Sequence, residues 1–153
     1  MAKTSAGILL FRIRGKELEV LLVHPGGPFW KSKDEGSWTI PKGEPQPSEE
    51  LLAAAIREFG EETGFSPEGD FIPLTPVKQK SGKFVYSWAI EGNFDIESIK
   101  SNFFEIEWPP HSGKKKEFPE IDKAGWFTIS EGTKKINAAQ VALLTELKER
   151  ISK

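Results

Sequence analysis

The amino-acid sequence predicts an α/β protein of the α+β type, in which helices cover a mixed β-sheet. One apolar stripe has the i, i+3, i+4, i+7 spacing of a helix packed on a sheet, and it consists of Leu52, Ala55, Ile56 and Phe59. Strand-like runs alternate with helical segments but form no strict strand–helix–strand repeat, which favours a mixed sheet. A length of 153 residues suits a single domain, residues 1–153.

The first 47 residues predict strands joined by turns. The strand-like segments are residues 7–13, 18–24 and 37–40. Residues 14–17 form a hairpin turn between the first two, and residues 41–47 form a turn-rich connection. Residues 25–36 are rich in Gly, Pro and Lys and have no period, so they predict a loop. A loop of about 12 residues in a compact domain is usually functional, so we expect a role for this one.

The clearest helix is predicted over residues 48–63. Ser48 is a suitable N-cap, and Glu49 and Glu50 favour the positive end of the helix dipole. Gly64 predicts a left-handed stop at the other end. The remaining elements are a hairpin at 77–80 and 83–90, strands near 103–108 and at 124–129, and a helix at 136–151.

Composition excludes several classes of function. The 21 Lys+Arg and 23 Asp+Glu give a formal net charge of −2, which disfavours binding of a long nucleic acid. The chain has no cysteine and only His24 and His111, both of which we interpret as structural or incidental, so oxygen atoms must hold any metal. No segment has the ~20 apolar residues of a membrane span. Residues 1–5 lack a signal-peptide layout, so we expect a cytoplasmic protein without membrane contact.

Three carboxylates share one arc of the predicted helix. At 100° per residue, Glu61 and Glu62 flank Glu58, within an arc of roughly 100° that lies away from the apolar stripe. Like charges at this spacing repel, and a hard divalent cation such as Mg²⁺ would offset the repulsion. An acidic helix face can also simply be solvated, with Arg57 as a surface ion-pair partner.

The surrounding segment decides between these two interpretations. Residues 43–65, GEPQPSEELLAAAIREFGEETGF, resemble the Nudix box, G-x5-E-x7-R-E-U-x-E-E-x-G-U, where U is a bulky aliphatic or aromatic residue. All nine specified positions are filled at the right spacing: Gly43, Glu49, Arg57, Glu58, Phe59, Glu61, Glu62, Gly64 and Phe65. The chain is therefore identified as a member of the Nudix hydrolase family. The resemblance implies an α/β/α sandwich with a mixed sheet.

The resemblance also implies roles for the residues of the box. Glu58, Glu61 and Glu62 would bind Mg²⁺ or Mn²⁺, helped by the main-chain carbonyl of Gly43. Arg57 would orient these carboxylates, with Glu49 as its partner.

A fourth carboxylate is expected outside the box. The segment Phe118-Pro119-Glu120-Ile121-Asp122 resembles an acidic element of Nudix members that act on dinucleoside polyphosphates or trim RNA caps. On that match Glu120 is a further metal ligand, with Glu117 as its nearest competitor. Either Glu61 or Glu120 could be the base that activates water, and the sequence does not choose between them.

Basic and aromatic residues supply candidate substrate contacts. Lys42 precedes Gly43 and could meet a phosphate. Trp30, Trp38 and Tyr86 could stack on a base, although aromatic residues in strands are more often part of the core. In the loop 25–36, Phe29 and Trp30 could form a movable stacking platform. The lysines 114–116 are either phosphate contacts or part of a solvated loop.

The reaction implied is hydrolysis of a pyrophosphate linkage in a nucleoside diphosphate linked to another group, X. The sequence favours a (di)nucleoside polyphosphate such as diadenosine tetraphosphate as substrate. A house-cleaning nucleoside triphosphate pyrophosphohydrolase is the alternative, and a catalytically idle nucleotide- or metal-sensing module is the alternative that is not an enzyme. The expected partner is thus a small-molecule nucleotide, and no oligomeric state is predicted.

Overall fold

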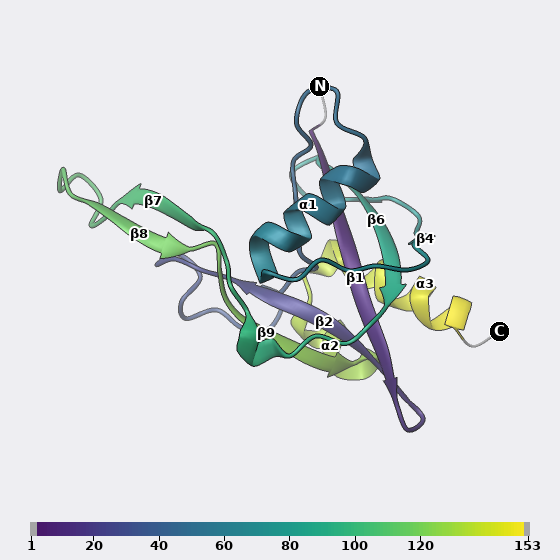
Figure 1. Ribbon diagram of the computed structural model, residues 1–153. Coiled ribbons are helices and arrows are strands. Elements are labelled where there is room, and N and C mark those ends of the chain that lie inside the picture. Colours follow the sequence, from purple (N-terminus) through teal and green to yellow (C-terminus); the bar gives the residue numbers. More distant parts are fainter. Residues whose placement is uncertain (1–2, 152–153) are drawn as a thin grey trace.

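The structure, a computed structural model that describes residues 3–151, is built around one mixed sheet (Figure 1). The strands of this sheet are β1 (Thr4–Arg14), β2 (Glu17–Pro25), β3 (Lys42–Gly43), β4 (Ile72–Pro73), β5 (Val77–Lys78), β6 (Phe84–Glu91) and β9 (Ile121–Thr128). The main order is β4-β6-β1-β2-β9, with β3 on β1 and β5 on β6. Only β1 and β6 pair in parallel.

Helices cover both faces of the sheet. They are α1 (Leu51–Thr63), α2 (Ile129–Lys135) and α3 (Val141–Ile151), with short 3-10 turns at Ile96–Ser98 and Ala138–Gln140. The residues of β1 alternate between two cores, because successive side chains of a strand point to opposite faces. Ile8 and Leu10 pack with α1, whereas Leu9 and Phe11 pack with α3. This arrangement confirms the predicted α/β/α sandwich.

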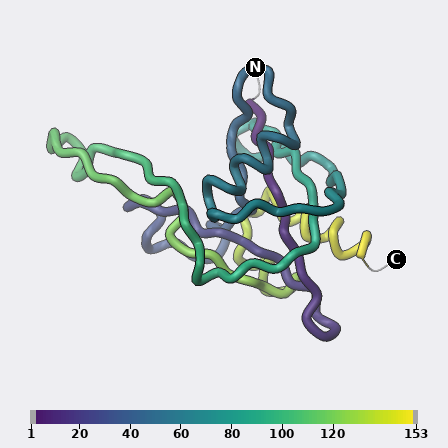
Figure 2. The backbone as a smooth tube through the Cα atoms, viewed as in Figure 1, coloured from purple at the N-terminus to yellow at the C-terminus, as the bar shows by residue number. Residues whose placement is uncertain are grey.

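A separate two-stranded hairpin extends from the body of the molecule (Figures 1 and 2). Its strands are β7 (Phe103–Glu107) and β8 (Lys115–Pro119), paired antiparallel. The predicted strand near 103–108 is confirmed as β7, but the sequence did not predict its partner β8. The chain then passes from β8 through Glu120 directly into β9.

The start of α1 differs from the prediction. Its N-cap is Glu50, not Ser48, and Ser48 has a left-handed φ of 65°. The chain turns at Ser48, and Glu49 lies before the helix. There its carboxylate accepts a hydrogen bond from the backbone N–H of Gln46. The stop at Gly64 is confirmed, with φ 81° and its N–H donated to the Gly60 carbonyl.

Two further elements also differ from the prediction. Residues 37–40 form isolated bridges, Val23–Thr39 and Trp38–Ile136, in place of a strand. The predicted helix 136–151 starts later, at Val141, because residues 129–135 form α2 and the chain between them is a 3-10 turn. No helix among residues 3–151 is long and apolar enough to cross a membrane.

Candidate functional site

The site starts where α1 meets the short strand β3. Gly43 is fixed by its pairing with Ala6 of β1, and the carboxylate of Glu58 lies directly against it. A Cβ on Gly43 would be 2.0 Å from Oε2 of Glu58, far inside van der Waals contact. Only glycine therefore allows the backbone of β3 and the Glu58 carboxylate to meet, which explains the glycine that begins the motif.

Arg57 connects the acidic side chains of the helix. Its Nε and Nη2 donate to the two carboxylate oxygens of Glu49, at 2.8 and 2.9 Å, in a bidentate fork. Its Nη1 donates to Glu58 at 2.9 Å and to Glu61 at 2.8 Å. The pKa of Glu49 is lowered to about 2, and the hydrogen bonds from Arg57 are the largest cause. The predicted pairing of Arg57 with Glu49 is confirmed, and it holds the guanidinium between the other two carboxylates.

Glu62 is the most deeply buried acidic residue of the site, with 7% of its surface exposed. Burial, followed by the nearby charges of Glu58 and Glu120, raises its pKa to about 9. The backbone N–H and the ammonium of Lys42 act in the opposite direction. A buried carboxylate beside others is costly unless a cation or a proton neutralises it. Glu62 therefore keeps a proton near pH 7 when no cation is bound.

Glu120 joins this cluster from the junction between β8 and β9. Burial, followed by the charge of Glu61, raises its pKa, and its own charge raises the pKa values of Glu58 and Glu62. Its competitor Glu117 is exposed on β8 and pairs across the hairpin with Glu105. The structure thus brings Glu120 to the box carboxylates and leaves Glu117 on the hairpin.

The donor atoms of the cluster suit a hard divalent cation. Four carboxylates and a backbone carbonyl offer oxygen alone, the ligand type that Mg²⁺ and Mn²⁺ prefer. Among residues 3–151, no three acidic, His or Cys side chains are yet arranged so that they could hold an ion. Arg57 donates one hydrogen bond to a carboxylate oxygen of Glu58 and another to a carboxylate oxygen of Glu61. The residues fit such a cation by charge and chemistry.

The predicted substrate contacts lie in different surroundings. Tyr86 and Gly43 both pair with Ala6, so Tyr86 lies two strands from Gly43, about 10 Å away at the usual strand spacing. Lys42 is largely buried beside the cluster, and burial lowers its pKa. Trp30 is partly exposed, with the Nζ of Lys33 5.1 Å from its ring centroid.

Trp38 does not fit its predicted role. It is 6% exposed, and its ring packs edge-on against His24 and Phe127 in the core under α3. Its Nε1 donates to Asp34. Neither ring face is open to a nucleotide base, so the stacking prediction for Trp38 is wrong. The burial of His24 confirms that this histidine is structural.

A hollow beside Glu120 was missed by the sequence reasoning. It encloses about 560 Å³ between the loop after β2 and the β7–β8 hairpin. Its walls come from Gly27, Pro28, Lys31, Trp108, Lys116, Phe118, Pro119 and Asp122. The only sequence signal was the run of aromatic and basic residues in a hairpin whose pairing is not apparent from local pattern.

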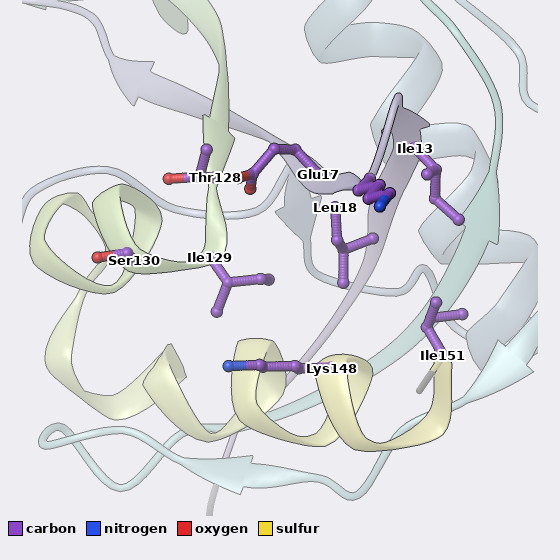
Figure 3. A pocket seen from close by; sticks show the side chains of 9 residues that line it. Ile13, Glu17, Leu18, Thr128, Ile129, Ser130, Lys148 and Ile151 are labelled. Atoms are coloured by element: carbon purple, nitrogen blue, oxygen red, sulfur yellow. The ribbon is translucent and has the colours of Figure 1, made fainter. Parts of the chain in front are cut away.

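A second hollow, of about 500 Å³, lies between α3 and the turn that joins β1 to β2 (Figure 3). Ile13, Leu18, Ile129 and Ile151 give it an apolar wall, with Lys148 at one side (Figure 3). None of the predicted site residues lines it. The carboxylate cluster therefore distinguishes the region around Glu120 as the candidate site.

Fold and site together describe an α/β/α protein with a cluster of acidic side chains on and beside its first helix. The chain belongs to the family of NUDIX domain proteins, because the model of that family matches residues 1–147.

Curated relatives match parts of the chain. The mRNA-decapping protein g5R of African swine fever virus is 49% identical over 47 residues, which are 31% of this chain and 19% of that protein. The chain spans less than a third of the length of the curated relatives that it matches.

Solved structures have the same fold. A complex of the C. elegans Ap4A hydrolase superposes with a TM-score of 0.69 at 21% identity, covering 97% of this chain and 98% of that one. The NUDIX domain of Shewanella oneidensis NrtR, in complex with ADP ribose, has a TM-score of 0.69 at 16% identity. That match covers 99% of this chain and 89% of the NrtR chain. Identities this low establish a shared fold and leave the substrate open.

Proposed function

We propose that this chain is a divalent-cation-dependent hydrolase that cleaves a pyrophosphate linkage in a nucleoside diphosphate linked to another group. One observation carries the proposal: Glu58, Glu61, Glu62 and Glu120 lie close enough to act on one another electrostatically, with Glu58 against Gly43 and Arg57 bonded to Glu58 and Glu61. A solvated acidic face would not bury Glu62 or bring in an acid from a segment far away in the sequence. The cation is Mg²⁺ or Mn²⁺, which is consistent with the all-oxygen donor set.

In this proposal the residues of the site divide into cation ligands, positioning residues and a base. The four carboxylates and the Gly43 carbonyl would hold the cation, which would supply neutralisation of pyrophosphate charge and a lower pKa for water. Glu49 and Arg57 are positioning residues, because Arg57 reaches the ligands and Glu49 fixes Arg57. Glu61 or Glu120 accepts the proton of the attacking water.

The substrate that we propose is a dinucleoside polyphosphate such as diadenosine tetraphosphate. Lys42 meets a phosphate beside the cluster, and Tyr86 and Trp30 contact a base. The choice rests on the resemblance of residues 118–122 to the acidic element of members that act on dinucleoside polyphosphates. A nucleoside triphosphate is the competing substrate, and its cleavage is compared with that of the dinucleoside polyphosphate.

The test is product analysis after incubation of the purified chain with Mg²⁺ or Mn²⁺ and a panel of substrates. The panel holds diadenosine tetraphosphate, the common nucleoside triphosphates, ADP-ribose and a capped RNA fragment. We expect cation-dependent cleavage, with the dinucleotide preferred, and a loss of at least ~10²-fold in kcat for Glu58→Gln. Glu50→Gln, an exposed acid beside the same helix, is the matched control and should retain full activity. Cleavage that persists in Glu58→Gln would refute the site, and preference for triphosphates would favour the house-cleaning alternative.

A further inference from the structure

The hollow beside Glu120 is built by two segments that lie far apart in sequence. The backbone N–H of Gly26 donates to the Glu120 carbonyl at 2.8 Å, which ties the loop after β2 to the junction of β8 and β9. A Cβ on Gly26 would lie 2.0 Å from the Pro119 carbonyl oxygen, so the two backbones are in direct contact. One wall of the hollow is therefore the peptide that precedes Glu120 itself.

Aromatic rings form the hairpin side of this hollow. Trp108 closes the end of the hairpin, where its N–H donates to the Lys114 carbonyl, and Phe118 faces the hollow from β8. The ring of Phe29 meets Trp108 edge-on, with centroids 5.6 Å apart, although Phe29 is 56% exposed. Exposed aromatic rings around a concave surface are unfavourable in water and are typical of a ligand site.

The charges of the hollow favour an anionic ligand. Lys31 and Lys116 line it from opposite segments, the loop and the hairpin. Asp122 also lines it, but its carboxylate is hydrogen-bonded to the buried His24 at 2.8 Å. A volume of about 560 Å³ lies within the usual range of roughly 300–1,000 Å³ for small-molecule sites. Aromatic walls with two flanking lysines match a nucleobase that carries phosphate.

We propose that this hollow binds the distal nucleoside of the substrate, with the base stacked on Trp108 and Phe118. The inference rests on the proposed function, since it assumes a polyphosphate held at the carboxylate cluster. Glu120 belongs to the cluster and Pro119 to the hollow, and neighbouring Cα atoms are only about 3.8 Å apart. In this proposal the far end of a substrate anchored at Glu120 extends into the hollow. Trp108 and Phe118 then form a stacking wall next to the predicted platform of Phe29 and Trp30, since the ring of Phe29 contacts Trp108.

Two substrates with the same phosphate chain isolate the second base. Diadenosine tetraphosphate and adenosine 5′-tetraphosphate differ only by one adenosine, so steady-state kinetics on both report the contribution of that adenosine. We expect Trp108→Ala to raise KM for the dinucleotide about tenfold or more, the scale of losing one base–aromatic stack, and to change KM for adenosine tetraphosphate less than twofold. Trp108→Phe keeps a ring and should retain most of the affinity.

Phe103→Ala is the matched control. Phe103 is 62% exposed on the same hairpin, and strand alternation points it to the face opposite Phe104. It should change neither KM. An equal effect of Trp108→Ala on both substrates, or no effect on either, would overturn the inference while leaving the proposed hydrolase intact.

A binding measurement separates this inference from the proposed function. Equilibrium dialysis with AMP, in the absence of divalent cation, requires no catalysis. If the wild-type chain hydrolyses neither tetraphosphate, the proposed function fails, and the dialysis alone decides the hollow. AMP binding that is about tenfold weaker in Trp108→Ala supports a nucleotide site there, and unchanged or undetectable binding to both proteins overturns it.

Discussion

Replacing Glu62 by glutamine, which does not titrate, should make the cation-free protein more stable at neutral and alkaline pH. The pKa of this carboxyl is raised from 4.5 to about 9 in the folded state, chiefly by burial. Between these two values the unfolded chain has lost the proton that the folded chain keeps. Unfolding therefore releases a proton, and the stability contributed by the protonated form below pH 4.5 is lost as the pH rises toward 9.

The size of the effect follows from the shift. One proton per molecule gives a fall of about 1.4 kcal/mol in the free energy of unfolding for each pH unit in this window. At pH 7 the loss relative to pH 4.5 amounts to about 3 kcal/mol, a large part of the 5–15 kcal/mol typical of a domain. Glu62→Gln keeps the shape of the side chain and removes the titration.

Urea denaturation in EDTA at pH values from 5 to 8 measures this directly. The stability of Glu62→Gln should match that of the wild type near pH 5 and exceed it by a few kcal/mol at pH 8, following the slope given above. Glu50→Gln, at an exposed position before α1, should follow the wild-type curve. Parallel curves for the wild type and Glu62→Gln would refute the argument that burial holds this carboxyl in its protonated form.

Three substitutions test other parts of the site by kinetics and thermal unfolding. Gly43→Ala places a Cβ 2.0 Å from the Glu58 carboxylate and should lower kcat by at least ~10²-fold; wild-type turnover would contradict the close approach. Arg57→Lys loses the bidentate fork and should weaken activation by Mn²⁺ about 10–100-fold, while the melting temperature changes little; unaltered activation would remove its positioning role. Glu120→Gln should lower kcat whereas Glu117→Gln should not, and the reverse result would move the fourth carboxylate to the hairpin.

Features fixed by local spacing were predictable from the sequence. The carboxylates and Arg57 lie on one helix, so their relative directions follow from its period, and the Gly64 stop needs only one residue of left-handed backbone. The Arg57–Glu49 fork followed from the motif. These predictions needed no knowledge of how distant segments pair.

Features set by tertiary packing were not predictable in this way. Ser48 is a good cap by type, but the chain turns there so that Glu49 can bond to Gln46 and Arg57. Trp38 has no local signal that separates a core ring from a stacking ring. The hollow with Trp108 depends on the pairing of β7 with β8, for which turn and strand patterns in that polar stretch are weak.

Binding of Mn²⁺ to the wild type and to Glu62→Gln tests the central claim most directly, because it needs neither a substrate nor an assumption about the reaction. Titration followed by the electron paramagnetic resonance signal of free Mn²⁺ gives the affinity of each protein. We expect the wild type to bind Mn²⁺ at pH 8, and Glu62→Gln to bind it at least about tenfold more weakly, the scale of disturbing the ligands of a metal. Equal affinities for the two proteins would contradict the assignment of the buried carboxylate cluster as the cation site.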